Sequence, residues 1–135
     1  MLVLDSSVSL AWALDDEQDL GPELLAQLTA TDTAMVPAHW ILEVTNGLRM
    51  AVKRRRLESG DPPQVMARIR DQPIHVDSET AVRCWHEIPV LADAYGLTTY
   101  DAAYLELAMR LDVPLATLDQ DLARAARAAK VPLFQ

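Results

Sequence analysis

Acidic side chains directly follow two of the predicted strands. Asp5 ends the apolar run MLVLD, Asp119 ends PLATLD, and a predicted helix begins straight after each of them. A third acid, Asp101, lies in the first turn of a predicted helix, one turn before Leu105 on a stripe that continues to Met109 and should face the core. In open α/β sheets the functional crevice lies beyond the carboxyl ends of the strands. These three carboxylates are therefore placed where they could share one crevice.

A fourth acid, Glu43, lies within the long helix predicted from His39 to Leu57. It stands at the edge of an apolar stripe at helical spacing, whose members are Trp40, Ile41, Val44, Leu48 and Val52. Gly47, one turn after Glu43, costs a helix about 1 kcal/mol relative to alanine. That cost predicts that another part of the backbone approaches closely on this side.

Taken singly, each acid also has an ordinary structural interpretation. Asp5 and Asp119 could cap the helices that follow them, because aspartate is a preferred N-cap. Asp101 could be the acid of a capping box that starts at Thr98, and Glu43 could be a solvated helix residue. Residue type and spacing alone leave these interpretations open beside a metal-binding one.

The surrounding elements predict an α/β fold. Strands are predicted at residues 1–5, 34–37, 73–76, 114–118 and 131–135. Helices are predicted at residues 6–14, 20–30, 39–57, 62–70, 78–96, 98–112 and 120–129. Pro89 is expected to kink or break the fifth of these helices. Strands that alternate with helices indicate βαβ units and a mostly parallel sheet.

Composition sets bounds on the class of protein. The chain has 135 residues, half of them hydrophobic, which suits one domain with a core of its own. A formal net charge of −8 argues against broad, charge-driven binding to nucleic acid or anionic membranes. It does not exclude nucleic acid as a substrate, because bound cations would offset the acids. The single cysteine, Cys84, cannot form an internal disulfide, so a cytoplasmic location is expected. No apolar run reaches membrane-spanning length, and the N-terminus does not resemble a signal peptide, so no membrane association is expected.

Four short motifs stand in order along the chain: LDSSV, EVTNGL, LTTYDAAYLELA and PLATLD. Together they resemble the signature of PIN-domain ribonucleases, and among these they are most similar to the VapC-type toxins of bacterial toxin–antitoxin pairs. The resemblance runs from Leu2 to the C-terminus. Each motif is weak by itself, but four in the right order, each with an acid at the expected place, are a strong signal.

The resemblance implies that Asp5, Glu43, Asp101 and Asp119 are catalytic and together hold one or two Mg²⁺ or Mn²⁺ ions. It also implies supporting groups near these acids, namely Ser6, Asn46 and Thr117. Mg²⁺ prefers oxygen ligands, and a bound metal ion can activate water for attack on a phosphodiester. The implied activity is metal-dependent endoribonucleolytic cleavage of RNA. Four carboxylates without metal repel one another, so at least one should have a raised pKa.

The same resemblance implies the fold and the partners. The expected fold is a single PIN-like α/β domain over residues 1–135, with a short parallel sheet of four or five strands and helices on both faces. The expected partners are an RNA substrate, a cognate antitoxin protein that holds the toxin inactive, and a second copy of the chain in a homodimer.

One basic block interrupts the acidic sequence, and it consists of Lys53, Arg54, Arg55 and Arg56. It ends the helix that carries Glu43, where cations complement the helix dipole. The alternative is contact with RNA phosphates or with an acidic segment of a partner.

The remaining candidate residues suggest no separate chemistry. The histidines His39, His75 and His86 are widely spaced and form no recognisable transition-metal motif. Cys84 and Trp85 are predicted to pack within an apolar helix rather than to take part in catalysis.

Two rival functions use the same residues. The first is an aspartyl phospho-acceptor or phosphohydrolase with Asp5 as nucleophile. Haloacid-dehalogenase-like enzymes of that class need a second aspartate two residues later, and this chain has Ser7 there. The second rival is a non-catalytic binding module on the same fold, and the presence of all four acids counts against it.

Overall fold

A parallel sheet lies at the centre of the computed structural model, which describes residues 1–14, 33–55 and 62–134. Within this part of the chain the sheet has four strands in the order β3-β2-β1-β4. The strands are β1 (Leu2–Leu4), β2 (Ala34–Val36), β3 (Ile74–Val76) and β4 (Leu115–Ala116). Val3 pairs with Met35 on one side and with Leu115 on the other, so β1 is an inner strand. The strand predicted for residues 131–135 is reduced to a single bridge between Leu133 and Leu115.

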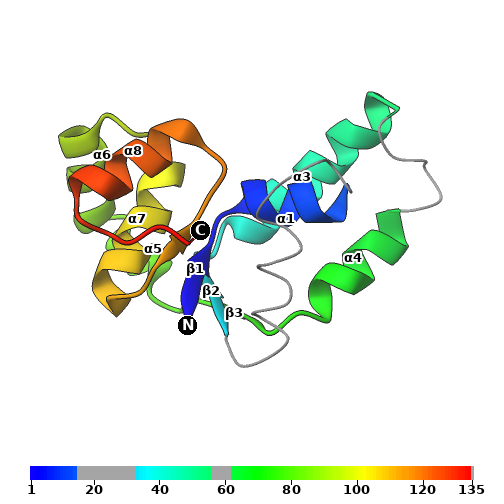
Figure 1. Cartoon of the computed structure of the whole chain (residues 1–135), viewed down its shortest axis with the longest axis horizontal. Coiled ribbons are helices and arrows are strands. Elements are labelled where there is room, and N and C mark those ends of the chain that lie inside the picture. Colours follow the sequence, from blue (N-terminus) through cyan, green and yellow to red (C-terminus); the bar gives the residue numbers. More distant parts are fainter. Residues whose placement is uncertain (15–32, 56–61, 135) are drawn as a thin grey trace.

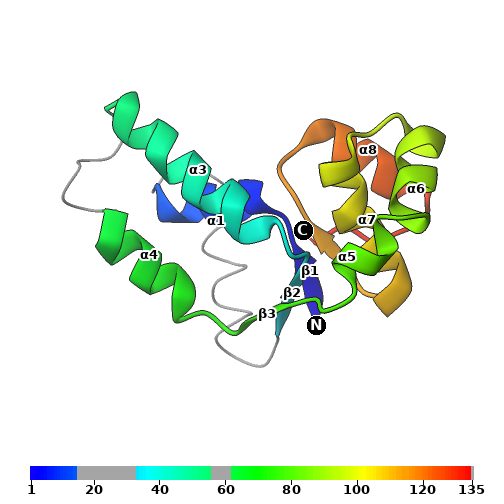
Figure 2. The same cartoon turned by 180° about the vertical axis from the view of Figure 1, so that it is seen from behind.

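Helices flank this sheet on both faces. They are α1 (Ser6–Ala13), α3 (Trp40–Lys53), α4 (Pro62–Arg70), α5 (Thr80–Arg83), α6 (Glu87–Tyr95), α7 (Thr99–Leu111) and α8 (Gln120–Ala128). In Figures 1 and 2 the strands lie between a group formed by α1, α3 and α4 and a group formed by α5 to α8. The predicted fold class is confirmed. The helix predicted for residues 20–30 lies outside the described residues, and no described helix is long and apolar enough to cross a membrane.

Helix α7 forms much of the core on its side of the sheet. Every residue from Ala102 to Ala108 is buried, because α7 packs on β1 and β4 and also contacts α6 and α8. Met109 was expected on the buried stripe but is 42% exposed. That part of the prediction is wrong, because the buried arc of α7 ends at Ala108 and Met109 falls on its open side.

The predicted ends of α7 are confirmed. Thr98 caps the helix, since its Oγ1 accepts a hydrogen bond from the Asp101 backbone N–H at 3.1 Å. Asp112 follows the last helical residue with a φ of 54°, in the left-handed region that ends many helices. Pro114 then prevents any continuation.

The segment around Pro89 forms two helices, but the break lies earlier than the proline. α5 ends at Arg83, α6 begins at Glu87, and Pro89 lies in the first turn of α6. In that turn the backbone N–H has no partner within the helix, so a proline is tolerated there. Cys84 and Trp85 lie in the junction and are exposed, Trp85 by 89%, so the prediction that they pack in a helix is wrong.

Gly47 marks the contact between α1 and α3. A methyl group at this position would meet Leu10 Cδ2 at 2.7 Å and Leu10 Cγ at 3.1 Å. The predicted close approach is therefore present, although the neighbour is the Leu10 side chain rather than backbone.

A third aspartate follows a strand, and it serves to join elements. Asp77 comes directly after β3, and Arg110 of α7 donates to it from Nη2 at 2.7 Å and from Nη1 at 3.3 Å. Thr80 Oγ1 donates to the same carboxylate at 3.0 Å. Burial by itself would raise the pKa of Asp77, but these hydrogen bonds outweigh it and hold the pKa below its usual range. The Asp77–Arg110 pair therefore ties the end of β3 to α7.

Candidate active site

Asp5 is the most enclosed of the four predicted acids. It leaves β1 and is only 4% exposed. Its Oδ2 accepts hydrogen bonds from Ser7 Oγ at 2.6 Å and from Thr117 Oγ1 at 2.7 Å. Burial raises its pKa, and Glu43 and Asp119 add to the rise, although the two hydroxyls oppose it. Asp5 precedes α1 but makes no side-chain capping bond, so the capping interpretation is wrong for this residue.

The hydroxyls near Asp5 connect the ends of β1 and β4. Ser7 Oγ accepts from the backbone N–H of Leu118 at 3.0 Å, and Thr117 Oγ1 accepts from that of Asp119 at 3.0 Å. Thr117 was predicted as a supporting group, whereas Ser7 was not. The motif LDSSV contains both serines, and the family resemblance implied a role only for Ser6, directly after the first acid.

Glu43 lies in the first turn of α3 and is half-buried. Its Oε1 accepts a hydrogen bond from Tyr104 Oη at 2.5 Å and another from Ser6 Oγ at 3.4 Å. Ser6 Oγ also lies 3.5 Å from Asp5 Oδ1, so this predicted supporting residue stands between two of the acids. His39 Nε2 is 3.5 Å from Glu43 Oε1.

The pKa of Asp101 shows the electrostatic repulsion among the four acids. Burial raises its pKa from 3.8 to about 6, and the negative charges of Asp119, Asp5 and Glu43, followed by Asp121, contribute to the rise. The expectation of a raised pKa among metal-free acids is confirmed. The four predicted acids lie in four separate segments of the chain, and the charges of three of them contribute to the raised pKa of the fourth.

Asp119 has a structural contact as well as a place in the cluster. Its Oδ1 accepts from the backbone N–H of Leu122 at 2.8 Å and so caps α8. The capping interpretation is therefore correct for one oxygen of Asp119. The charge of the same carboxylate still acts on Asp5 and Asp101.

The sequence profile of the PIN domain family matches residues 2–128. The chain belongs to the PIN-domain family. It is 31% identical over 129 residues to Ribonuclease VapC12 of Mycobacterium tuberculosis, from strains H37Rv and CDC 1551, with 93% of this chain and 92% of the relative covered. The resemblance to VapC-type ribonucleases, inferred from the four motifs, is confirmed.

Two solved structures are similar to this PIN domain in fold. PAE2754 from Pyrobaculum aerophilum matches with a TM-score of 0.70 and 19% identity, covering 92% of this chain and 84% of that one. FitAcB from Neisseria gonorrhoeae matches with a TM-score of 0.55 and 19% identity, covering 100% and 97%. At this identity the likeness supports the fold alone.

The donor atoms of this PIN domain suit a hard divalent cation. Asp5, Glu43, Asp101 and Asp119 offer carboxylate oxygens, the type of ligand that Mg²⁺ and Mn²⁺ prefer. Within the described residues, however, no group of three or more His, Cys, Asp or Glu side chains already stands as a set that could hold a metal ion. The residues fit the ion by the chemistry of their donor atoms, and the charges of the other three acids contribute to the raised pKa of Asp101.

Besides Ser7, two residues of the PIN domain's site were not predicted from sequence. Tyr104 is 0% exposed and donates to Glu43, and burial together with that hydrogen bond raises its pKa, so its hydroxyl remains a donor. His39 lies against Tyr104 with ring centroids 5.2 Å apart. Tyr104 follows Asp101 by three residues, and that spacing on a helix was a signal that could have found it.

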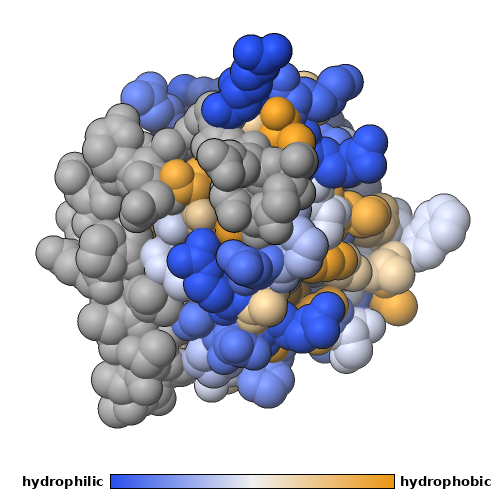
Figure 3. Space-filling model, turned by 90° about the vertical axis from the view of Figure 1, so that its right-hand side faces the viewer, coloured by the Kyte–Doolittle hydropathy of each residue, from blue (hydrophilic) through white to orange (hydrophobic). Residues whose placement is uncertain are grey.

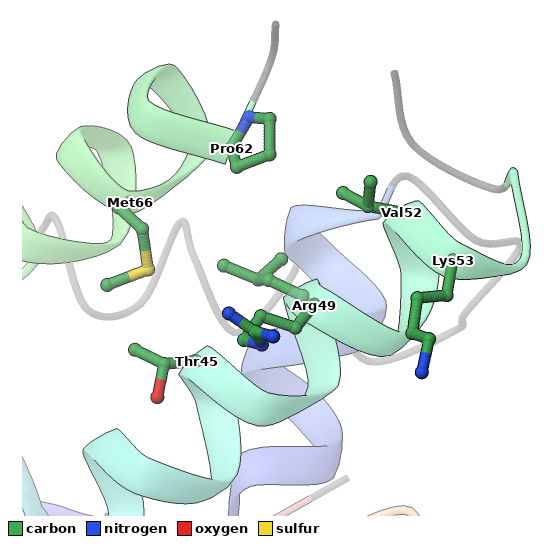
Figure 4. Close-up of a pocket in the computed structure, with 7 residues that line it drawn as sticks. Thr45, Arg49, Val52, Lys53, Pro62 and Met66 are labelled. Carbon is green, nitrogen blue, oxygen red and sulfur yellow. The ribbon is translucent and has the colours of Figure 1, made fainter. Parts of the chain in front are cut away.

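The other predicted residues lie away from these contacts. Asn46 is exposed on α3, one turn after Glu43. Lys53, Arg54 and Arg55 are exposed at the end of α3, and Arg56 lies outside the described residues. A groove of about 410 Å³ lies beside them, lined by residues of α3 and α4 that include Arg49, Lys53 and Met66. Figure 4 shows Arg49 extending toward α4 while Lys53 points away from it.

Proposed function

We propose that this PIN domain is a metal-dependent endoribonuclease of the VapC type. Its Asp5, Glu43, Asp101 and Asp119 would hold one or two Mg²⁺ or Mn²⁺ ions. The observation that carries the proposal is that Ser6 Oγ lies within 3.5 Å of both Asp5 and Glu43, while Thr117 Oγ1 donates to Asp5 and accepts from the Asp119 N–H. The raised pKa of Asp101, to which the charges of the other three acids contribute, agrees with this. The identity to Ribonuclease VapC12 supports RNA as the substrate.

The metal, when bound, would supply the activated water and the charge neutralisation that phosphodiester hydrolysis needs. The chain's own residues would prepare the site for it. Ser7 and Thr117 fix the Asp5 carboxylate, and the Leu122 N–H fixes that of Asp119. Half-buried Glu43 and Asp101 would complete the set of carboxylates.

Three residues would support the four acids. Ser6 lies between Asp5 and Glu43, and Thr117 donates to Asp5, which agrees with their proposed roles. Asn46 would contribute from the exposed side of α3, one turn beyond Glu43, where RNA could reach it.

The partners follow from the family type and from the surface. We infer a cognate antitoxin that holds this toxin inactive, and a homodimer, as expected for VapC-type proteins. The basic block, with its three described members exposed, is proposed to contact RNA phosphates or an acidic segment of the antitoxin. Figure 3 shows hydrophilic groups beside hydrophobic ones on the face turned toward the viewer, which is the side of α3 and α4 in Figure 1.

The rival phospho-acceptor function receives less support. An aspartyl nucleophile must expose an oxygen to the phosphorus atom, but Asp5 is only 4% exposed. Its Oδ2 is also occupied by two short hydrogen bonds. A role as a fixed ligand agrees better with this burial.

Cleavage of RNA by purified, antitoxin-free protein tests the proposal. With Mg²⁺ or Mn²⁺ present, the parent should cut RNA, and excess EDTA should stop it. Asp5→Asn should abolish cleavage, whereas Asp93→Asn, at an exposed acid of α6, should leave it unchanged. Undiminished cleavage in EDTA would refute the metal mechanism.

A further inference from the structure

Glu43 receives its polar contacts on a single oxygen atom. Tyr104 Oη donates to Oε1 at 2.5 Å, Ser6 Oγ donates at 3.4 Å, and His39 Nε2 lies 3.5 Å away. Within the described part of the chain, these contacts all go to Oε1 and leave Oε2 available. The Tyr104 bond is the short, charge-assisted kind, which is stronger than a bond between neutral groups.

Asp5 shows the same division between its two oxygens. Its Oδ2 accepts the two short bonds from Ser7 and Thr117, while Oδ1 has the 3.5 Å contact from Ser6. In both acids one oxygen is fixed by hydroxyl groups and the other is less engaged. This arrangement suits carboxylate ligands whose orientation is fixed by hydrogen bonds before the cation binds.

Packing alone does not require the Tyr104 hydroxyl. The side chain is completely buried, so phenylalanine would fill the same space without a hydroxyl that must find a partner. The His39 ring meets the Tyr104 ring edge-on, and its Nε2 lies 3.0 Å from the Tyr100 carbonyl oxygen. His39 thus packs against the contact between Tyr104 and Glu43.

We propose that Tyr104 is a positioning residue that orients Glu43 for the cation. This inference rests on the proposed function. The Tyr104 hydroxyl holds Oε1 of a long, rotatable side chain and leaves Oε2 for the metal. Helix α7 therefore contributes twice to the site, since it carries the acid Asp101 and, three residues later, the group that orients a second acid.

The test is Tyr104→Phe in the full-length, antitoxin-free protein, with Tyr95→Phe as the matched control at a half-buried tyrosine of α6. Calorimetry gives the Mn²⁺ affinity, and melts in EDTA confirm that each variant is folded. We expect Tyr104→Phe to bind Mn²⁺ roughly 10- to 100-fold more weakly, the usual effect of losing a group that orients a ligand. Its kcat should fall at limiting Mn²⁺ and recover at saturating Mn²⁺, with KM for RNA unchanged. The control should match the parent in every measurement.

A double-mutant cycle with Glu43→Gln separates positioning from packing. If Tyr104 acts through Glu43, Tyr104→Phe should cause no further loss of Mn²⁺ affinity in the Glu43→Gln background. Equal losses in both backgrounds would overturn the assignment. So would a Tyr104→Phe variant that binds Mn²⁺ like the parent while the parent binds metal and cleaves RNA. A parent that neither binds Mn²⁺ nor cleaves RNA would overturn the proposed function, and this assignment with it.

Discussion

At the scale of single residues, the candidate site is a set of acids whose negative charges repel one another. Asp5 is fixed by hydroxyls, Asp119 caps a helix with one oxygen, and Asp101 lies among them with a pKa of about 6. A raised carboxyl pKa means that the folded state binds the proton more tightly than the unfolded state does. In metal-free protein, Asp101 therefore reduces stability as the pH rises from about 4 to about 6.

The first prediction concerns Asp101→Asn in metal-free buffer. At pH 7 the variant should be as stable as the parent or more stable, because it relieves repulsion. The difference should disappear below about pH 4, where Asp101 is protonated in both states. A purely helix-capping role predicts a loss of about 0.5–1 kcal/mol instead. Urea melts of both proteins across this pH range decide between the two roles.

The second prediction concerns the same pair of proteins with metal added. Mn²⁺ that binds only the folded site should raise the melting temperature of the parent by mass action, by an amount equivalent to about 2.7 kcal/mol at 100 times Kd. Asp101→Asn should lose most of that rise and nearly all RNA cleavage. If the variant keeps both the rise in melting temperature and the RNA cleavage, Asp101 is not a metal ligand.

At the scale of elements, α1 and α3 approach closely because Gly47 has no side chain. Alanine at this position improves helix propensity by about 1 kcal/mol but forces Leu10 to move. Overpacking of this kind costs about 1–3 kcal/mol. The two effects can be separated because Leu10 is the contacting group.

The third prediction is that Gly47→Ala changes stability in opposite directions with and without the Leu10 side chain. Gly47→Ala should destabilise the parent by about 1 kcal/mol, the balance of overpacking and propensity. In a Leu10→Ala background, where the space is open, the same change should stabilise by about 1 kcal/mol. Thermal or urea melts of the four proteins give the result. The same sign in both backgrounds would show that Leu10 does not set the requirement for glycine.

The fourth prediction concerns the pair that joins β3 to α7. The pKa of Asp77 is lowered, so its stabilising effect is complete above about pH 4 and is lost as the pH falls through the lowered value. Asp77→Asn should cost about 1.5–3 kcal/mol at pH 7, because Arg110 loses a charged acceptor. The difference in the free energy of unfolding between variant and parent should become smaller in strong acid. Asp93→Asn, at an exposed acid, serves as the control in the same urea melts.

Sequence patterns predicted the elements well because local signals coincide with tertiary ones. Thr98 caps α7 as expected, and the apolar runs before Asp5 and Asp119 form the paired strands β1 and β4. The errors occur where tertiary packing decides. Met109 has helical spacing but falls on an open side, and Trp85 lies in a junction that no periodicity marks.

In the candidate site, too, the residues found from local motifs differ from those that depend on tertiary contacts. The four acids and the hydroxyl neighbours Ser6 and Thr117 could be taken from motifs, because each motif is short and continuous. Tyr104 and His39 were missed because their importance depends on contact with Glu43, and the partners Tyr104 and Glu43 are 61 residues apart. The approach of residues so far apart in the chain is set by the tertiary fold, which a single sequence does not display.

At the scale of the whole molecule, the proposed function requires an acidic chain to bind a polyanion. The formal net charge is −8, whereas the end of α3 exposes Lys53, Arg54 and Arg55. If RNA is bound by this protein, local charge and cations must overcome the overall repulsion.

The fifth prediction tests that local charge. Replacing Lys53 and Arg54 by glutamine should weaken single-stranded RNA binding and reduce the salt dependence of log K by roughly 0.7 per lost phosphate contact. Arg127→Gln, at an exposed arginine of α8, should leave the slope unchanged. Binding measured between about 50 and 200 mM salt gives the slopes. An unchanged slope in the double variant would restrict the block to its helix-dipole role or to the antitoxin.

The pairing of β1 with β4 also governs when this protein can become active during its synthesis. Asp5 leaves the ribosome well before its hydrogen-bond partner Thr117, which is made 112 residues later. β1 cannot become an inner strand until β4 exists, and contacts between such distant parts of a chain form slowly. A nascent chain therefore carries scattered acids rather than a site until residue 119 has been added. Under the proposed function, no nascent chain shorter than that can cleave RNA.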